Sequence, residues 1–410
     1  MNKFAVAAGT ASALMFGTAA FATDLEVTHW WTSGGEAAAV AEFAKALDAS
    51  GDHWIDGAIA GSGGVARPII ISRIIGGDPM GATQLNHGLQ AIELVEAGLM
   101  LDITDVAEAE GWRDIIHPIG LLDACTIDGR IYCAPVNIHS WQWIWLSNKA
   151  YADAGVAVPA NWDEFVASAP ALEAAGKIPL AMGQQPWQTG GAFSVLLVAL
   201  GGVELWTAIN VDHDEVAAAG ADAAKVFEAF GDARALSAGS NVQDWNQATN
   251  LVITGQAGGQ IMGDWARGEF SVANQVSGVD YTCLPGLGVQ EILDTGGDAF
   301  YFPLNDDPEI TAAQKRLAAL LVSPSVQVAF NLAKGSLPIR GDIDMSTADD
   351  CMKKGLAILA AGNILPAGTM VMPPDAAEQL NSLLVEFWND TSITPAQVQA
   401  NYAAVIASVE

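Results

Sequence analysis

The sequence predicts an α/β protein of two lobes with a ligand cleft between them. Short apolar runs that alternate like strands are repeatedly followed by apolar residues at helical spacing. The chain has 410 residues, more than a single hydrophobic core usually holds, so we expect two domains. Polar and aromatic residues collect at strand-to-helix turns from residue 30 to residue 334. A cleft that draws on both lobes would unite segments so far apart in sequence.

The N-terminal residues 1–22 have the pattern of a secretory signal peptide. Lys3 precedes an apolar, small-residue stretch, and Ala20-Phe21-Ala22 matches an A-x-A cleavage site. A transmembrane helix is the alternative, but glycine and threonine interrupt the run, and no later segment looks long and apolar enough to span a bilayer. We therefore expect an exported, soluble protein that is cleaved after Ala22.

The composition is strongly acidic, with 47 acidic against 17 basic side chains and a formal net charge of −30. Such a chain repels nucleic acid and anionic lipid, so neither is expected as a partner. The acidity favours solubility and does not by itself indicate a reaction.

Two adjacent tryptophans follow the first predicted strand, residues 25–28, and precede a predicted helix at residues 37–47. Because side chains alternate along a strand, Trp30 and Trp31 cannot both enter one core. We expect at least one indole to face a cleft beside Glu36. An aromatic face next to a carboxylate suits a sugar ring, which has an apolar C–H face and hydroxyls around its edge. The alternative is that one indole packs inside and the other covers a lobe surface.

A glycine-rich turn, Gly61-Ser62-Gly63-Gly64-Val65-Ala66, opens the next predicted helix. It matches the G-x-G-x-x-A form of the dinucleotide fingerprint. An exported protein rarely meets free NAD, however, and the acidic partner expected about 20 residues further on lacks a clear strand to carry it. We therefore expect no cofactor, and a turn that lets the backbone approach the cleft.

Two further polar turns follow predicted strands, which is where ligands bind in open α/β sheets. They are Gln84-Leu85-Asn86-His87-Gly88 and Gln260-Ile261-Met262-Gly263-Asp264-Trp265. Gly296-Gly297-Asp298 lies between two predicted strands, and Lys334-Gly335-Ser336-Leu337-Pro338-Ile339-Arg340 follows a predicted helix.

Three tryptophans at 141, 143 and 145 alternate as on one face of a strand, so most should pack in a core.

The four cysteines predict disulfides, because the chain is exported. Residues 125–133 have the pattern of a hairpin around a three-residue Asp-Gly-Arg loop, which would place Cys125 and Cys133 opposite one another. Cys283 and Cys351 would then pair by default. Free buried thiols are the alternative for both pairs.

Several of these motifs resemble those of the family 1 extracellular solute-binding proteins of ABC transporters, and most closely the periplasmic glucose or aldose binders. The resemblance covers essentially the whole mature chain, with the motifs in the expected order. They are Trp30-Trp31-Thr-Ser-Gly-Gly-Glu36, Pro135-Val-Asn-Ile-His139, Ser147-Asn148-Lys149, Gln260-Ile-Met-Gly-Asp-Trp265 and Lys334-Gly-Ser-Leu-Pro-Ile-Arg340.

This resemblance implies a two-lobed periplasmic binding protein fold, with hinged lobes that close on a sugar, and docking to membrane permease subunits. The implied protein is periplasmic, monomeric and not an enzyme. We place the first lobe at residues 23–134 plus about 285–340, and the second at about 135–284 plus 341–410.

The resemblance also implies a set of sugar-binding residues. They are Trp30, Trp31, Glu36, Gln84, Trp245, Trp265, Asp298 and Lys334, to which Asn86 and His87 add polar groups at the Gln84 turn. Structural alternatives are a core position for Trp245, turn capping for Asp298 and a helix C-terminal cation for Lys334.

Two positions depart from the family pattern. Asn86 stands where a basic residue is expected, and Ala367 stands where the family has a late histidine. Losing two hydroxyl partners argues against strict glucose specificity and extends the expected ligands to an altered monosaccharide, a polyol or a glycoside.

The main alternative function is a secreted glycoside hydrolase that uses Glu36 and Asp298. Hydrolysis needs two carboxylates about 5 to 10 Å apart, but the expected pairing of both with Lys334 argues against it. Metal-dependent hydrolysis is a weaker alternative than glycoside hydrolysis, because the six histidines are scattered and the motif H-E-x-x-H is absent. A receptor that feeds a chemotaxis protein would use the same sugar site.

Overall fold

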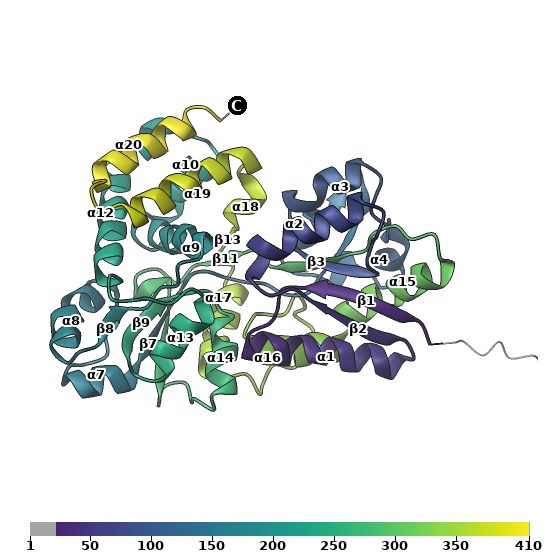
Figure 1. The fold of residues 1–410 in the computed structure, drawn as a ribbon, viewed down its shortest axis with the longest axis horizontal. Helices are drawn as coiled ribbons and strands as arrows, with labels where there is room; N and C mark the ends of the chain where they lie inside the picture. The colour runs from purple at the N-terminus through teal and green to yellow at the C-terminus, as the bar shows by residue number, and fades with distance from the viewer. Residues whose placement is uncertain (1–21, 410) are drawn as a thin grey trace, which may run out of the picture.

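The computed structural model describes residues 22–409 (Figure 1). The predicted signal peptide therefore lies outside the described residues, except for Ala22. The chain forms two lobes, each with its own sheet and covering helices. This is the two-lobed periplasmic binding protein fold that the sequence predicts.

The first lobe is built on a five-stranded sheet with the order β2-β1-β3-β12-β6. Parallel pairing joins β1 to β2 and β3, whereas β12 runs antiparallel to β3 and β6. The strands are β1 Asp24–His29, β2 His53–Ala58, β3 Ala82–Asn86, β4 Thr126–Ile127, β5 Arg130–Ile131, β6 Cys133–Pro135 and β12 Asp298–Tyr301. The helices are α1 Gly34–Ser50, α2 Ser62–Ile75, η1 Leu89–Ala91, α3 Ile92–Glu96, α4 Thr104–Ala109, α5 Trp112–Ile115, α6 Gly120–Asp123, α15 Pro308–Val322 and α16 Pro324–Lys334.

The second lobe has a four-stranded sheet with the order β10-β7-β9-β8. A short parallel pair, β11 with β13, lies beside it. The strands are β7 Trp143–Ser147, β8 Ile178–Leu180, β9 Ala257–Ile261, β10 Tyr281–Pro285, β11 Leu293–Thr295 and β13 Ile364–Pro366. The helices are α7 Asn148–Ala154, α8 Trp162–Ala174, α9 Pro186–Leu196, η2 Leu197–Gly201, α10 Gly202–Asn210, α11 Glu215–Ala218, α12 Ala221–Leu236, α13 Trp245–Ile253, α14 Ala266–Val272, η3 Gly286–Gly288, α17 Asp350–Ala360, α18 Gly368–Val371, α19 Pro374–Asn389 and α20 Pro395–Ile406.

The chain passes between the two sheets three times. It leaves the first sheet after β6, returns between β10 and β12, and leaves again after α16. These passages bring three separate segments together where the lobes meet. The exact residue boundaries of the lobes stay a prediction.

Local sequence explains where several elements begin. Ser33 caps α1 by accepting a hydrogen bond from the Glu36 amide, and Gly51 ends that helix with a positive φ of 103°. Asn161 and Glu164 exchange hydrogen bonds at the start of α8, as expected for a capping pair.

The longest apolar helix runs from Pro186 to Asn210, through a π turn at η2. Among residues 22–409 it is the one continuous helix long and apolar enough to cross a membrane by composition, so our expectation that no such segment follows the signal peptide was wrong. Its side chains pack in the core of the second lobe, where Phe193 contacts Phe227, Phe230 and Tyr402.

Both expected disulfides are present. Cys125–Cys133 joins the ends of the β4–β5 hairpin with a Cα–Cα distance of 5.1 Å, and Cys283–Cys351 joins β10 to α17 with a distance of 6.0 Å. The hairpin loop has two residues, and not the three we expected, because Ile127 pairs directly with Arg130. Asp128 and Gly129 both adopt a positive φ, as a tight two-residue hairpin turn requires.

Candidate functional site

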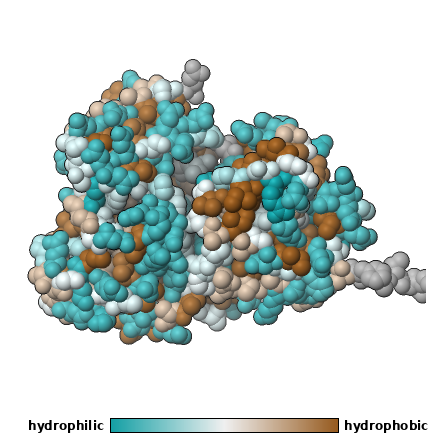
Figure 2. All heavy atoms as spheres, viewed as in Figure 1, coloured by the Kyte–Doolittle hydropathy of each residue, from teal (hydrophilic) through white to brown (hydrophobic). Residues whose placement is uncertain are grey.

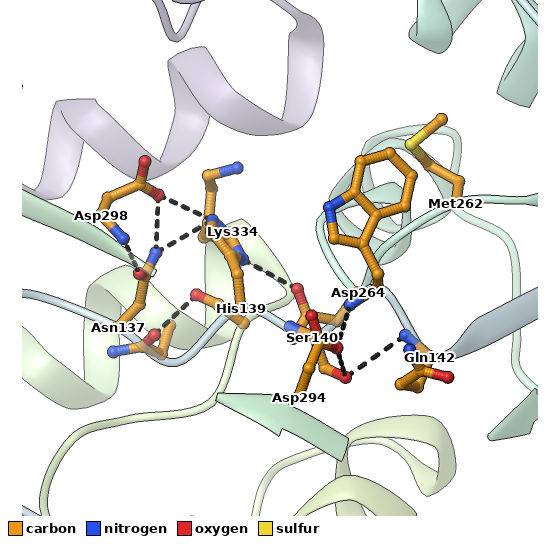
Figure 3. A network of polar contacts seen from close by, with 12 residues as sticks. Asn137, His139, Ser140, Gln142, Met262, Asp264, Asp294, Asp298 and Lys334 are labelled. Atoms are coloured by element: carbon orange, nitrogen blue, oxygen red, sulfur yellow. Dashed lines mark hydrogen bonds and ion pairs between the residues drawn. The ribbon is translucent and has the colours of Figure 1, made fainter. Parts of the chain in front are cut away.

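The centre of the lobe interface is a histidine held between two carboxylates (Figure 3). His139 Nδ1 lies 2.8 Å from Asp264 Oδ1, and its Nε2 lies 2.7 Å from Asp298 Oδ2. Asp264 follows β9 of the second lobe, whereas Asp298 begins β12 of the first. Burial lowers the pKa of His139, but the Asp298 and Asp264 carboxylates outweigh it and raise that pKa overall. Its ring nitrogens thus join a carboxylate of each lobe, and these two contacts tie the lobes together.

Both carboxylate oxygens of Asp298 accept hydrogen bonds from buried side chains. Its Oδ1 accepts from Gln84 Nε2 at 2.7 Å, and its Oδ2 accepts from Asn137 Nδ2 at 3.0 Å. The Asp298 amide in turn donates to Asn137 Oδ1 at 2.8 Å. Burial would raise the pKa of Asp298, but the charge of His139 and these bonds hold it well below its usual range. Asp298 is thus an ionised carboxylate inside a fixed polar network.

A second buried ion pair joins Lys334, the last residue of α16, to Glu36 in the first turn of α1. The Lys334 Nζ to Glu36 Oε1 distance is 3.1 Å, and Glu36 Oε2 accepts from Ser33 Oγ at 3.2 Å. The same Nζ lies 5.8 Å from the centre of the Trp31 ring and 5.9 Å from that of Trp265. The ammonium group therefore sits between an indole of each lobe.

Three indoles from the second lobe cluster beside this charge network. The Trp265 ring makes edge contacts with Trp141 and with His139, each at a centroid distance of 4.9 Å. Trp187 lies 5.4 Å from Trp141 and 6.2 Å from Trp265. The Nε1–H of Trp187 is buried and has no partner among the described residues. A cluster of this kind offers ring faces to an apolar surface and one free donor to a polar group.

The tandem tryptophans divide between two environments. Trp31 is 1% exposed, and its ring packs against Phe43, Phe300 and Phe330, so its expected sugar contact has no support from this arrangement. Trp30 is half-buried, and its backbone N–H donates to Gln84 Oε1 at 3.0 Å. Gly63 of α2 lies beside the Trp30 ring, because a Cβ atom at that position would be 3.4 Å from it.

The lobes also touch across the mouth of the cleft between them, seen as the hollow between the two halves in Figure 2. Gln185 Nε2 of the second lobe donates to Ser62 Oγ of α2 at 3.2 Å and to Asp244 Oδ1 at 3.0 Å. Glu269 of α14 accepts from the Gly35 amide of α1 at 2.7 Å. These contacts describe lobes that are closed on one another.

The structure brings together Glu36, Gln84, Trp265, Asp298 and Lys334 from the predicted set. Trp245 begins α13 outside the indole cluster, and its buried ring joins the core that includes Ala248 and Val252. Asn86 is half-buried and donates its backbone N–H to Gln90.

His87, at the Gln84 turn, is fully buried, and both of its ring nitrogens lack a partner among the described residues. Burial lowers the pKa of His87 to about 4, so the ring is neutral at pH 7. The roles of the predicted residues in ligand binding stay predictions.

Sequence reasoning missed several side chains of this site: Asn137, His139, Trp141, Gln185, Trp187 and Asp264. Their signal was present, because His139 and Asp264 lie in turns where a polar residue follows a strand. Trp187 is the second residue of α9, directly after the polar turn that follows β8. Within residues 22–409, no group of three or more His, Cys, Asp and Glu side chains is arranged to hold a metal ion.

Comparison with known proteins connects this architecture to a family. A family model described as bacterial extracellular solute-binding protein matches residues 30–321. A probable sugar-binding periplasmic protein of Rhizobium meliloti is 35% identical over 367 residues, covering 88% of this chain and 87% of that protein.

Two solved structures have a similar fold. The bacterial solute receptor AcbH, described as preferring β-D-galactopyranose, has a TM-score of 0.76 at 19% identity, covering 94% of this chain and 98% of its own. A solute-binding protein of Thermotoga lettingae bound to α-D-tagatose has a TM-score of 0.74 at 15% identity, and the match covers 94% of this chain and 100% of that chain. The chain belongs to the family of bacterial extracellular solute-binding proteins.

Proposed function

We propose that this protein is the periplasmic sugar-binding component of an ABC transporter. It binds a glucose-like monosaccharide, or a related glycoside or polyol, between its lobes and delivers it to the transmembrane permease subunits. It acts as a monomer and catalyses no reaction. The observation that carries the proposal is the cluster of Trp141, Trp187 and Trp265 next to the charged groups of both lobes.

The chemistry of this cluster suits a neutral polyhydroxylated ligand. Indole faces pack against the C–H face of a sugar, and the free Trp187 N–H can donate to a hydroxyl. The neighbouring charges are paired with one another, as Lys334 is with Glu36 and Asp298 is with His139. A charged ligand would have to break these pairs, whereas a neutral sugar can hydrogen-bond to them as they stand.

Closure follows from contacts with both lobes. Trp30 and Gln84 belong to the first lobe, and Trp187 and Trp265 to the second. A ligand that touches both sets binds the closed arrangement more tightly than the open one, so it shifts the population toward closure. The named relatives support the sugar class, since four of them are called probable sugar-binding periplasmic proteins.

Glycoside hydrolysis by Glu36 and Asp298 is disfavoured. A hydrolase needs one protonated carboxyl as its general acid. Glu36 is ion-paired to Lys334, and the low pKa of Asp298 keeps it ionised at neutral pH. Release of nitrophenol from aryl glycosides by the purified protein would overturn this conclusion.

A thermal-shift screen of the mature protein against monosaccharides, disaccharides and polyols tests the proposal. A ligand that binds only the folded state raises the Tm, and closure should reduce the small-angle scattering radius. If no sugar changes either quantity at millimolar concentration, the proposal is wrong.

Trp187→Phe then tests the site itself. The phenyl ring keeps an aromatic face but removes the indole N–H, so we expect sugar affinity to fall about 3- to 10-fold, the worth of one hydrogen bond. Trp388→Phe is the matched control, because Trp388 packs on Phe230 in the second lobe away from the cluster. If Trp187→Phe binds the sugar as tightly as the wild type does, Trp187 is not part of the binding site.

A further inference from the structure

Helix α2 of the first lobe carries one arginine toward the cleft. The helix begins at Ser62, whose Oγ accepts from Gln185 Nε2 of the second lobe at 3.2 Å, so this end of α2 lies at the lobe interface. Arg67 stands more than one turn further along, and its Nε donates to the Gly63 carbonyl at 3.0 Å. Long side chains of a helix fold back toward its N-terminus in this way. The guanidinium group of Arg67 is therefore held at the cleft end of α2.

The same guanidinium group lies beside the accessible tryptophan of the first lobe. A Cβ atom at Gly63 would stand 3.4 Å from the Trp30 ring and 3.6 Å from Arg67 Nε, so both groups flank this glycine. Trp30 and Arg67 are each half-buried. An indole ring and a set of charged donors thus stand together on the first lobe, as the indole cluster and the Trp187 N–H do on the second.

The terminal Nη donors of Arg67 have no partner within residues 22–409. Every other arginine of this range is ion-paired to a carboxylate or, in Arg234, bonded to three backbone carbonyls. Burial lowers the pKa of Arg67, but arginine stays charged in proteins and presents its Nη donors as a planar fork. A ligand that supplies two acceptor oxygens therefore gains charge-assisted hydrogen bonds here.

Nearby carboxylates favour hydroxyl oxygens over an anion as these acceptors. The charge of Glu378, on α19 of the second lobe, acts on Arg67 and opposes the effect of burial on its pKa. Asp244 lies on the same side of the cleft as Gln185, which donates to it at 3.0 Å. An anionic ligand is repelled by these groups and by the net charge of −30. Sugar hydroxyls are neutral, and they accept from a guanidinium group while they donate to a carboxylate.

We propose that Arg67 is a specificity-determining residue of the sugar site, which donates from its two Nη groups to a pair of neighbouring hydroxyls of the bound sugar. The inference rests on the proposed function and narrows it to sugars with two adjacent free hydroxyls on the edge that faces α2. A sugar that lacks either hydroxyl leaves a charged, half-buried donor without its partner, so it binds more weakly.

Calorimetry on the mature protein tests the proposal, with glucose, galactose, mannose and xylose as probes. The monodeoxy forms of the sugar that binds most tightly are then measured on the wild type, R67M and R67K. We expect R67M to raise the Kd of the parent sugar about 10- to 100-fold, the worth of one or two bonds from a charged donor. R67K keeps the charge but loses the fork, so its Kd should stay at least about fivefold above that of the wild type.

Coupling between Arg67 and single hydroxyls separates a direct contact from a structural role. We expect one or two deoxy sugars to bind the wild type about 10-fold more weakly than the parent sugar does, and to bind R67M within about threefold of the parent. R73M is the matched control, because Arg73 lies near the other end of α2 and is paired with Glu26. Every Kd of R73M should stay within about twofold of the wild type.

The possible results separate this inference from the proposed function. Sugar binding that is unchanged in R67M overturns the role of Arg67 while the proposed function stands. An equal loss for the parent and for every deoxy sugar in R67M means that the side chain only shapes the site, and this also overturns the proposal. Tighter binding of glucuronate or galacturonate than of the neutral sugars, lost in R67M, would show that the fork holds a carboxylate instead of hydroxyls. Binding of no probe to the wild type refutes both proposals.

Discussion

Asp294 offers a test in which the effect of one substitution on stability depends on pH. Its carboxyl is buried in β11, where Oδ1 accepts from Ser140 Oγ and from the Trp141 amide, both at 2.8 Å. Burial raises the pKa of Asp294 from an ordinary 3.8 to about 6, despite these two hydrogen bonds. Asp294→Asn keeps an acceptor oxygen in the same place and removes the titration. We therefore expect the variant to gain stability over the wild type as the pH rises.

The magnitude follows from the two pKa values. Between pH 3.8 and about 6 the unfolded chain releases a proton that the folded protein keeps, so the free energy of unfolding falls as pH rises through this window. Each pKa unit corresponds to about 1.4 kcal/mol, so the ionised Asp294 costs the folded state about 3 kcal/mol above pH 7. The stability of the variant relative to the wild type should thus be about 2–3 kcal/mol greater at pH 8 than at pH 4.

Urea unfolding at pH 4, 6 and 8, followed by circular dichroism, measures this difference. Taking the variant against the wild type at each pH cancels the titration of all other groups. Asp306→Asn is the control, because Asp306 is exposed, and we expect no change in its relative stability across the same pH values. A relative stability of Asp294→Asn that is the same at pH 4 and pH 8 would refute the assignment of a raised pKa.

Two further predictions concern covalent and ionic links between distant segments. Lys334→Met should lower the free energy of unfolding by about 3–5 kcal/mol, because it leaves the buried Glu36 charge unpaired. Adding Glu36→Gln should restore most of the lost stability, as measured by urea unfolding. If the double variant is no more stable than Lys334→Met, the pairing is contradicted. Replacing Cys283 and Cys351, which lie 68 residues apart, with serine should lower the free energy of unfolding by about 4 kcal/mol. Removing the hairpin disulfide, whose cysteines lie 8 residues apart, should lower it by about 2.5 kcal/mol, because a shorter loop is closed. A larger loss of Tm for the hairpin variant would reverse that ranking and refute the loop-entropy reasoning.

Local patterns predicted the elements of the fold well, because their causes lie within a few residues. The helix expected to begin at the glycine-rich turn does begin at Ser62, and the strand expected at residues 25–28 is part of β1. The helical pattern of residues 214–229 is divided into α11 and α12 at Gly220, where the backbone is extended. Glycine inside an apolar helical pattern was the local signal for that break.

The polar network could not be predicted in the same way, because it depends on long-range pairing. His139 contacts Asp264 and Asp298, which lie 125 and 159 residues further along the chain. No spacing rule links residues so distant. What the sequence does carry is the placement of each at the end of a strand, and the fold then brings these strand ends together.

The positions of Trp30 and Trp31 can be predicted in more detail from the alternation of side chains along β1. The rule of alternation predicted that the two indoles would part, but it did not say which enters the core. Leu25 and Val27 are both 0% exposed, whereas Asp24 is exposed and Glu26 is half-buried, so the odd-numbered face of β1 is the more buried one, although Thr28 is buried as well. Extending that period by two further steps assigns Trp31 to the core and Trp30 to the opposite face, as the structure has them. The same period thus selects Trp30 as the tryptophan of this pair that remains accessible to a ligand.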